Sequence, residues 1–488
     1  MQTTSRRDFL KAAGLGLATL AAPAGFAAGA RQPLDSAGST ALTTGRDRPN
    51  IIVILADDLG FADVGFNGCK DIATPHIDSL AKNGVRFTNG YVSHPFCSPT
   101  RAGLMTGRYQ QRFGHENNPA WLPEDTKVGL PLTETFLVKP LRAAGYVTGA
   151  IGKWHLGAAP CFHPNERGFA EYFGFRGGGH LYLPDEKNPL PAAKTWQVEY
   201  RIPLNRNQEL VAHEGYMTDI LSREAVAFVG RHKAEPFFLY LAYNAVHTPL
   251  QAPEKYLARF PHIADEKRRT YAAMNSAMDD GIGTVLAALR EHKLENDTLI
   301  FFLSDNGGPI TVVPCSNAPL RGGKGQVLEG GIHVPFVACW PGRLPAGAVY
   351  NEPVIALDLL PTALALAGAQ PPEKPLDGVN LIPYLFGDNK AAPHERLFWR
   401  TGGGVTWAVR EGRYKLASLA KAEKPQLFDL EADIGETRDL AAEKPDVVKR
   451  LTAAFEAWNA QLVAPLFESP RPGPKKLQQQ QKKKAAAQ

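Results

Sequence analysis

The residues best suited to chemistry are concentrated in one stretch, residues 97–108, which reads CSPTRAGLMTGR. Pro99 predicts that a helix begins close to it, because proline fits the first turn of a helix. In such a helix Arg101, four residues after Cys97, can place its guanidinium near the sulfur. This cation would favour an anion there, either a thiolate or a negatively charged substrate. A small buried cysteine beside a helix start is the alternative for these two residues alone.

Polar side chains also follow four apolar runs that have the composition of buried strands. The runs cover residues 50–56, 145–152, 236–243 and 298–304, and such short, nearly unbroken runs suit strands buried on both faces. The residues that follow them are Asp57 and Asp58, Lys153 and His155, His247, and Asp305 and Asn306. Each alone has an ordinary structural explanation, such as a helix cap or a hydrogen-bonded core histidine. Because ligands bind beyond the carboxyl ends of parallel strands, the four groups together predict one site.

The carboxylates and the amide in this set indicate a metal site. Asp57 and Asp58 repel each other at the end of a buried run unless a cation or basic side chains compensate their charge. With Asp305 and Asn306 they offer hard oxygen ligands, which favour Ca²⁺ or Mg²⁺ over zinc. Lys324 adds a further cation to the candidate site.

The elements that must position these residues form an α/β pattern. Amphipathic helices are predicted at residues 214–231 and 271–292, between the strand-like runs. Strands that alternate with helices are typical of a mainly parallel sheet sandwiched by helices. Toward the C-terminus the pattern changes to short β-type runs at 406–410, 414–416 and 427–430, followed by a predicted helix at 436–462.

The N-terminal 30 residues are predicted to be an export signal. Arg6 and Arg7 precede an apolar run rich in alanine and glycine at residues 12–28, which is the arrangement of a twin-arginine signal. The run is too short and too weakly hydrophobic for a permanent membrane anchor. We therefore expect the twin-arginine translocase of a bacterium to export the folded protein to the periplasm or the medium.

Composition and charge argue against a nucleic-acid partner. Hydrophobic residues make up 44% and charged residues 21% of the chain, as in ordinary globular proteins. The tail at 469–488, predicted to be disordered, holds six Lys and Arg residues and no acidic one, so it accounts for the net charge of +5. The five cysteines include no Cys-x-x-Cys pair. Those other than Cys97 are either buried thiols or form up to two disulfides: Cys69, Cys161, Cys315 and Cys339.

The pattern Cys-x-Pro-x-Arg-x-x-x-x-Thr-Gly, which starts at Cys97, resembles the first signature of the type I sulfatases in the alkaline phosphatase superfamily. Residues 145–155 resemble their second signature, and the likeness extends from about residue 48 to 462. It resembles arylsulfatase A and N-acetylgalactosamine-6-sulfatase in particular. The resemblance implies an alkaline-phosphatase-like α/β fold with a smaller C-terminal subdomain, an antiparallel sheet with a helix. It also implies hydrolysis of sulfate monoesters.

The resemblance assigns a role to each candidate residue. It implies that Asp57, Asp58, Asp305 and Asn306 bind Ca²⁺ together with residue 97, with Mg²⁺ as the alternative ion. Cys97 would be converted to Cα-formylglycine by a formylglycine-generating enzyme, and its hydrate would attack sulfur. The surrounding polar groups would be Arg101, Lys153, His155, His247 and Lys324. Among these, His247 with Lys324 would protonate the departing alcohol, and His155 would take a proton as sulfate is expelled.

The expected organisation has five parts. These are a signal peptide at 1–30, a linker at 31–47, a catalytic domain at 48–390, a C-terminal subdomain at 391–468 and the basic tail at 469–488. The expected substrate is a sulfated carbohydrate or an aryl sulfate. The loop-like residues expected at the mouth of the pocket are His180, Tyr182, Asp185, Trp196, Arg206, Asn117, Asn118 and Trp121.

Two other functions remain open on the sequence. Relatives in the same superfamily are formylglycine-dependent phosphonate monoester or phosphodiester hydrolases, which would use a similar site. If Cys97 stays a thiol, the protein would instead be a non-catalytic sulfoglycan-binding protein. The chemical state of residue 97 distinguishes a binding protein from an enzyme. The relative turnover of sulfate and phosphate esters distinguishes a phosphonate monoester or phosphodiester hydrolase from a sulfatase.

Overall fold

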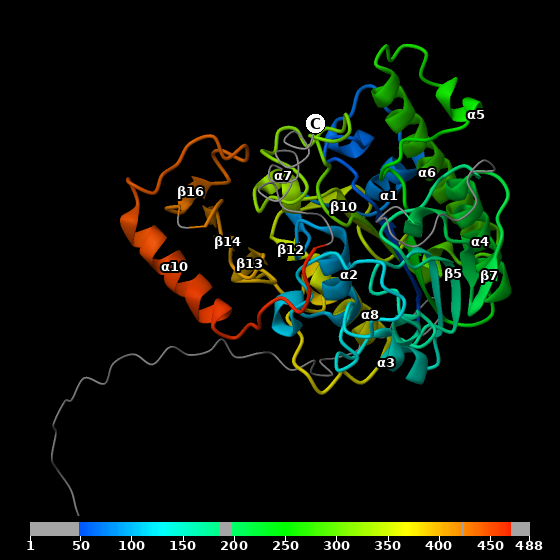
Figure 1. Ribbon diagram of the computed structural model, residues 1–488, viewed down its shortest axis with the longest axis horizontal. Coiled ribbons are helices and arrows are strands. Elements are labelled where there is room, and N and C mark those ends of the chain that lie inside the picture. The colour runs from blue at the N-terminus through cyan, green and yellow to red at the C-terminus, as the bar shows by residue number, and fades with distance from the viewer. Residues whose placement is uncertain (1–47, 185–197, 422, 470–488) are drawn as a thin grey trace, which may run out of the picture. The chain divides into compact units, whose positions relative to one another are not determined.

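A ten-stranded sheet forms the centre of the computed structural model, which describes residues 48–184, 198–421 and 423–469 (Figure 1). The N-terminal signal, the linker, Asp185, Trp196 and all but the first residue of the tail lie outside the described residues. In spatial order the strands are β11 (Ala348–Tyr350), β2 (Val85–Phe87), β10 (Phe336–Cys339), β9 (Thr298–Ser304), β1 (Asn50–Ala56), β8 (Phe237–Ala242), β4 (Val147–Lys153), β5 (Glu171–Phe175), β6 (Leu204–Arg206) and β7 (Glu209–Val211).

The middle of this sheet is parallel, as the apolar runs predicted. Strands β9, β1, β8, β4 and β5 pair in parallel, whereas β10 pairs antiparallel with both β9 and β2, and β6 and β7 extend the other edge antiparallel. Strand β1 shows why its sequence is apolar throughout. Ile51, Val53 and Leu55 join one hydrophobic core, and the alternate residues of the strand join the other. Each of these buried aliphatic side chains contributes roughly 1.5–3 kcal/mol of hydrophobic stabilisation.

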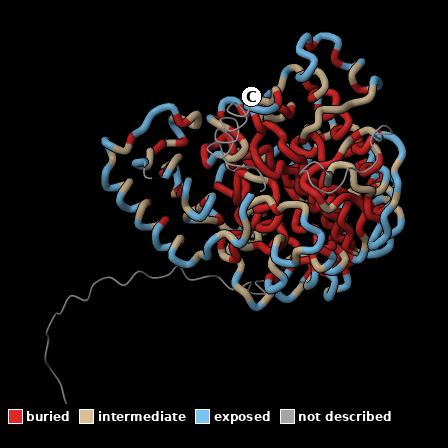
Figure 2. The backbone as a smooth tube through the Cα atoms, in the orientation of Figure 1, coloured by how far each residue is buried: buried red, intermediate tan, exposed pale blue. Residues whose placement is uncertain are grey.

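Helices cover both faces of the sheet. On one face lie α1 (Pro75–Lys82), α4 (Met217–Arg231), α5 (Glu254–Leu257) and α6 (Glu266–Glu291), and on the other α2 (Cys97–Thr106), α3 (Val138–Ala143) and α8 (Leu359–Ala367). The remaining short elements are α7 (Glu329–Ile332), α9 (Ile382–Leu385) and the paired β3 (Gly90–Tyr91) and β12 (Val354–Ile355). Figure 2 shows the buried residues concentrated on the sheet between these helices.

The C-terminal region forms the expected antiparallel sheet with a helix. Its strands are β13 (Arg396–Thr401), β14 (Thr406–Glu411), β15 (Tyr414–Ser418) and β16 (Gln426–Asp429), followed by α10 (Pro445–Asn459), all in the orange part of Figure 1. The start predicted for the helix at 436–462 was wrong, because α10 begins at Pro445. Pro445 occupies the first turn of α10, and Glu436 lies in the preceding connection, where its side chain is completely buried.

The start of α6, the cysteines and the apolar character of the helices also bear on the expectations from the sequence. Helix α6 begins at Glu266, earlier than predicted, because Asp265 caps it by accepting a hydrogen bond from the Arg268 amide. None of the five cysteines forms a disulfide. Among the described residues, no helix has both the length and the apolar character needed to cross a membrane.

Candidate active site

The strand register brings the predicted residues to one edge of the sheet. Ala56 pairs with Ser304, so Asp57 and Asp305 leave two neighbouring strands side by side. The backbone continues this alignment, because the Asp305 amide donates to the Ala56 carbonyl oxygen at 3.0 Å. Strands β8 and β4 end on the other side of β1 and bring His247, Lys153 and His155 to the same edge.

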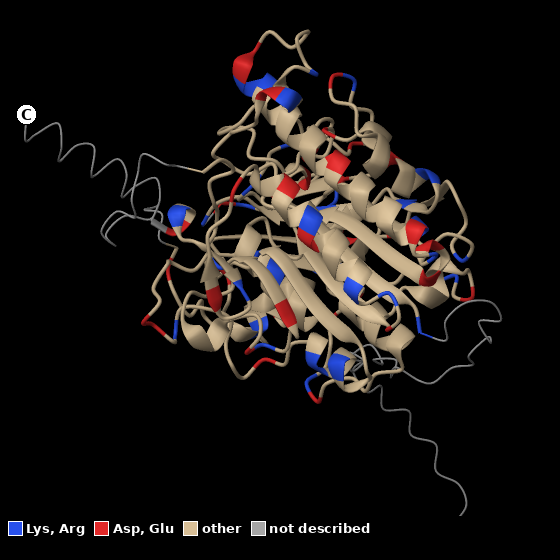
Figure 3. Cartoon of the chain, turned by 90° about the vertical axis from the view of Figure 1, so that its right-hand side faces the viewer, with Lys and Arg blue, Asp and Glu red and all other residues tan. Residues whose placement is uncertain are grey.

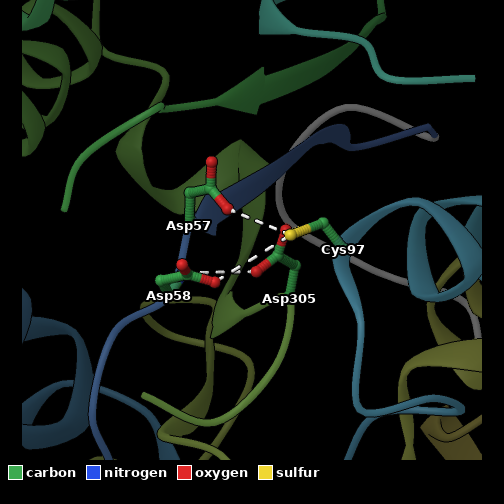
Figure 4. Close-up of side chains that lie close together, drawn as sticks. All are labelled: Asp57, Asp58, Cys97 and Asp305. Carbon is green, nitrogen blue, oxygen red and sulfur yellow. Dashed lines mark hydrogen bonds between the residues drawn. The ribbon is translucent and has the colours of Figure 1, made fainter. Parts of the chain in front are cut away.

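Cys97 is the first residue of α2 and lies at the centre of this group (Figure 4). Lys324 Nζ donates to Cys97 Sγ at 3.0 Å, and the sulfur lies 3.6 Å from Asp57 Oδ1 and 3.9 Å from Asp58 Oδ1. Burial raises the pKa of the Cys97 thiol to about 12, and the nearby Asp305 carboxylate adds to this effect. The side chain is therefore a neutral thiol at physiological pH, and the thiolate considered from the sequence is disfavoured.

The acidic residues fit a divalent cation. Ligand atoms of Asp57, Asp58, Cys97 and Asp305 lie within 4.8 Å of one another, and Figure 4 shows these side chains pointing toward a common centre. Asn306 Nδ2 donates to Asp58 Oδ1 at 2.7 Å, whereas its Oδ1 is buried without a hydrogen-bond partner among the described residues. Carboxylate and amide oxygens are ligands of Ca²⁺ and Mg²⁺. The donor set and the unpartnered oxygen therefore suit a hard cation.

Two adjacent carboxylates have opposite electrostatic environments. Burial raises the pKa of Asp57 to about 7, although Lys153 Nζ lies 2.7 Å from its Oδ2 and works against this rise. Burial also acts on Asp58, but Lys324 and His247 outweigh it and hold the pKa of that carboxyl well below its usual range. Lys324 Nζ donates to Asp58 Oδ1 at 2.5 Å. The ionised form of Asp57 is thus disfavoured by burial, and its protein neighbours do not fully compensate that effect.

Arg101 contacts the carboxylate edge of the site rather than the sulfur. Its Nη2 and Nε donate to Asp305 Oδ2 at 2.7 and 3.0 Å, and its Nη1 donates to the Lys153 carbonyl oxygen at 3.1 Å. The side chain is completely buried. The cation that contacts the sulfur is Lys324, which the sequence could place in the site but not against Cys97.

Both predicted histidines are neutral in this environment. Burial lowers the pKa of His247 to about 3, although the Asp58 carboxylate, 3.7 Å from its Nε2, acts in the opposite direction. Burial and the charge of Lys153 hold the pKa of His155 well below its usual range. The Nδ1 atom of His155 has no partner among the described residues. A neutral imidazole can accept a proton, and an anionic ligand beside it would favour its protonated form.

Residues that the sequence did not single out hold His155 in place. Its φ is +61°, an uncommon value for a residue with a side chain. Ser98 Oγ donates to the His155 carbonyl oxygen at 2.6 Å and lies 2.6 Å from His115 Nε2. A Cβ on Gly178 would lie 2.7 Å from His155 Nε2. Only the position of Ser98 inside the cysteine motif could have signalled any of these three residues.

Three of the residues expected at the pocket mouth have well-defined contacts within the protein. The ring nitrogens of His180 contact the carbonyl oxygens of Leu181 and Ile202, and Tyr182 donates to the carbonyl oxygen of His247 at 2.8 Å. Arg206 pairs with Glu224. His180 and Tyr182 are thus held by backbone oxygens and Arg206 by a carboxylate, and their place at the pocket mouth stays a prediction.

The second group of expected pocket residues lies nearer to Cys97. Asn118 Oδ1 accepts a hydrogen bond from the Ser98 amide at 3.0 Å, and Asn117 Nδ2 donates to the Phe467 carbonyl oxygen at 2.7 Å. The guanidinium of Arg176 lies 5.5 Å from the centre of the Trp121 ring. Asn118 therefore supports the start of α2, and Asn117 binds the C-terminal segment.

Comparison with known proteins gives a consistent result. The sulfatase family matches residues 49–369, and the C-terminal region of N-sulphoglucosamine sulphohydrolase matches residues 323–461. N-acetylgalactosamine-6-sulfatase of Sus scrofa is 35% identical over 393 residues, which cover 78% of this chain and 73% of that protein. Arylsulfatase A of Bos taurus is 36% identical over 433 residues, covering 80% and 83%.

A solved structure supports the same assignment. The crystal structure of Ps i-CgsB in complex with k-i-k-neocarrahexaose has 44% sequence identity and a TM-score of 0.81, and the match covers 86% of this chain and 94% of that one. The family match, the relatives and the shared fold agree with a buried cluster of carboxylates and cations around Cys97. The chain therefore belongs to the sulfatase family and is a sulfuric ester hydrolase.

Proposed function

We propose that the protein is an exported, Ca²⁺-dependent sulfatase that hydrolyses sulfate monoesters of a sulfated carbohydrate and uses formylglycine at position 97. One observation carries the proposal. Three buried carboxylates and the ammonium of Lys324 surround the sulfur of Cys97, at the point where the positive N-terminal end of α2 meets the sheet edge. This arrangement suits a tetrahedral anion held between a metal ion and cations.

The state of Cys97 supports its conversion to an aldehyde. A thiol whose pKa lies near 12 is a weak nucleophile at neutral pH. As the hydrate of formylglycine, residue 97 would instead present hydroxyl groups to the sulfur atom of the ester. The conversion requires a formylglycine-generating enzyme as a partner of this chain.

The metal would be held by Asp57, Asp58, Asp305 and Asn306, with residue 97 beside it. When bound, Ca²⁺ would stabilise negative charge on the sulfate oxygens and lower the pKa of a hydroxyl group next to it. Mg²⁺ takes the same ligand types and is the alternative ion. A cation at this position would also compensate the charge of Asp57, whose pKa burial raises.

The other side chains would bind the sulfate and move protons. The ammonium groups of Lys153 and Lys324 would hold sulfate oxygens, while Arg101 keeps Asp305 in position through its two hydrogen bonds. A bound sulfate ester would raise the pKa of His247, which could then, together with Lys324, protonate the departing alcohol oxygen. His155, neutral and with an unpartnered Nδ1, would accept the proton released from residue 97.

The relatives suggest which esters to test. Proteins similar to this chain are named for N-acetylgalactosamine 6-sulfate, and the 44% identical structure holds k-i-k-neocarrahexaose. We propose a sulfated oligosaccharide as the substrate. The two compounds for the first assay are N-acetylgalactosamine 6-sulfate and k-i-k-neocarrahexaose, followed by aryl sulfates.

The decisive experiment is mass spectrometry of the tryptic peptide 87–101 from protein made in its native host, combined with these assays. An aldehyde or its hydrate at residue 97, together with release of inorganic sulfate, supports the proposal. An unmodified thiol in mature protein would contradict it and indicate a binding protein. Faster turnover of phosphonate monoesters or phosphodiesters than of any sulfate ester would identify a different hydrolase.

A further inference from the structure

A second buried charge cluster lies outside the site and joins it to the C-terminal sheet. Lys415 Nζ, on β15, lies 2.8 Å from Glu329 Oε1 and 2.9 Å from Glu436 Oε1. All three side chains have no exposed surface. Tyr91 donates to the other oxygen of Glu329 at 2.7 Å, and His333 Nδ1 lies 3.0 Å from it. We call Glu329, Lys415 and Glu436 the buried triad.

Glu436 binds both ends of the segment that carries Lys324, residues 321–329, which we call the Lys324 turn. At the first end, Arg321 Nη1 donates to the Glu436 carbonyl oxygen at 2.8 Å. At the last end, the Glu329 amide donates to Glu436 Oε2 at 2.7 Å. The turn is closed by the Gly330 amide, which donates to the Arg321 carbonyl oxygen at 2.8 Å.

The middle of the Lys324 turn touches the catalytic edge through its backbone. The Lys324 amide donates to the Gly308 carbonyl oxygen at 3.3 Å, and the Gly325 amide donates to the Pro95 carbonyl oxygen at 2.9 Å. Pro95 precedes Cys97 by two residues. From this position Lys324 Nζ reaches both Asp58 Oδ1 and Cys97 Sγ. The backbone of the turn is therefore held on two sides, by Glu436 at its ends and by the catalytic edge at its middle.

The backbone of Glu436 is strained in a way that only its contacts explain. Its φ is +51°, a conformation that favours glycine. Strained residues persist where the surroundings determine their conformation, and they are frequent at functional sites. The surroundings here are the buried ion pair with Lys415 and the two ends of the Lys324 turn.

We propose that Glu436, held by its ion pair with Lys415, is a positioning residue for Lys324: together with Arg321 it fixes both ends of the turn and so holds the ammonium between Asp58 and residue 97. The inference rests on the proposed role of Lys324 in holding the sulfate and assisting the leaving group. It assigns to the C-terminal sheet a part in the reaction, in addition to its contribution to stability.

A double-mutant cycle distinguishes positioning from simple stabilisation. Glu436→Ala and Arg321→Gln are each made in the wild-type and the Lys324→Ala backgrounds. Arg321 is exposed, so Arg321→Gln should fold even if Glu436→Ala does not. Single-turnover rates are measured with excess enzyme on aryl sulfates of graded leaving-group pKa, at a temperature where circular dichroism shows every variant folded.

We expect each substitution to lower the rate about 10- to 100-fold in the wild-type background, because displacing a catalytic group by about 1 Å has effects of that size. The loss should be greatest for poor leaving groups. In the Lys324→Ala background the same substitutions should change the rate less than about twofold. Glu436→Gln, whose amide oxygen can still accept from the Glu329 amide, should lose less than Glu436→Ala.

Leu416→Ala is the matched control, because Leu416 is a fully buried neighbour of Lys415 on β15 and belongs to the hydrophobic core. It should lower the denaturation midpoint and leave the leaving-group dependence unchanged. Equal losses from Glu436→Ala and Arg321→Gln in both backgrounds would overturn the inference and leave the triad a structural feature. Full activity of Lys324→Ala would instead remove the proposed role of Lys324, on which the inference depends.

Discussion

Asp57 and Asp58 are neighbours in the chain, and their carboxyl groups nevertheless have pKa values shifted in opposite directions. Burial acts on both, but Lys324 and His247 overcome it at Asp58, whereas Lys153 does not overcome it at Asp57. At the scale of single residues the site is therefore incomplete without a further positive charge. The cation of the proposed metal site would supply such a charge.

The pH dependence of stability tests this reading of Asp57. The pKa of Asp57 is about 7 in the folded protein and 3.8 in the ordinary case. The protonated carboxyl group therefore contributes to the unfolding free energy fully below about pH 4, and this contribution is lost as the pH rises toward about 7. In chelator, the unfolding free energy of the wild type should fall across this range by about 2–4 kcal/mol more than that of Asp57→Asn. Urea unfolding followed by tryptophan fluorescence measures both.

Added Ca²⁺ should remove this difference in slope, because a cation at the site favours the ionised form. At a concentration about 100 times its Kd it should also stabilise the wild type by about 2.7 kcal/mol. Equal slopes for the two proteins in chelator would show that Asp57 is not the group that titrates.

His247→Ala should slow the reaction in proportion to the difficulty of the leaving group. A general acid contributes about 10²–10⁴-fold when the departing oxygen is basic, and little when it is a good leaving group. Rates for a series of aryl sulfates give the slope against leaving-group pKa, which should steepen in the variant. His262→Ala, at an exposed position, is the control. A uniform loss over the series would contradict the role of His247 as the acid.

At the scale of elements, the strand ends carry the charged groups and the intervening loops orient them. His155 lies two residues after the end of β4, but its ring packs against a segment that comes later in the chain. Gly178 packs against this ring, and Ser98 at the start of α2 holds the His155 carbonyl oxygen. The geometry of this histidine therefore depends on three elements that are distant in sequence.

Gly178→Ala tests the contact between this segment and His155. The added methyl group would lie 2.7 Å from His155 Nε2, and the ring must move to accommodate it. We expect kcat to fall at least tenfold with a small change in stability, because misplacement by about 1 Å can cost about 100-fold. Steady-state kinetics and thermal unfolding measure the two effects.

Gly230→Ala, in the last turn of α4, is the control for this substitution. Its new Cβ meets only His292 Nε2 at 3.6 Å, which is an ordinary contact. It should leave kcat unchanged and raise stability slightly, by up to about 1 kcal/mol. Unchanged kcat in Gly178→Ala would mean that the position of His155 does not limit the reaction.

At the scale of the whole molecule, the C-terminal sheet is tied to the catalytic part by buried polar contacts. Trp399 is completely buried and donates to the Val92 carbonyl oxygen at 2.7 Å. The proposed boundary at residue 390 lies between α9 and β13. Over the face drawn in Figure 3, acidic and basic residues are interspersed along helices and loops.

Export tests the proposed role of residues 1–30. Replacing Arg6 and Arg7 together by lysine should leave the protein in the cytoplasm, since the twin-arginine translocase reads that pair. Cell fractionation with immunoblotting in the native host measures the distribution. The Asp57→Asn variant, with its signal unchanged, serves as the control for exported protein. Normal export of the double-lysine protein would exclude this route.

The central strands and the residues at their ends could be predicted from the amino-acid sequence. Each strand is an unbroken apolar run because both faces of the sheet are covered, and in a parallel sheet the carboxyl ends lie on one edge. Asp57, Asp58, Lys153, His155, His247, Asp305 and Asn306 could thus be assigned to one place without coordinates. The motif around Cys97 identified the chemistry.

How these groups are held, and which of them touch, could not be predicted and depends on the packing of distant segments. Glu329 is separated from Lys415 by 86 residues and from Glu436 by 107, and neither pairing leaves a periodic signal. Glu436 looked like the start of an amphipathic helix, because an acidic residue before such a pattern ordinarily faces water. The ion pair with the buried Lys415 instead places the Glu436 side chain in the interior. Local patterns encode burial and secondary structure, whereas ion pairs between distant segments depend on how the chain packs.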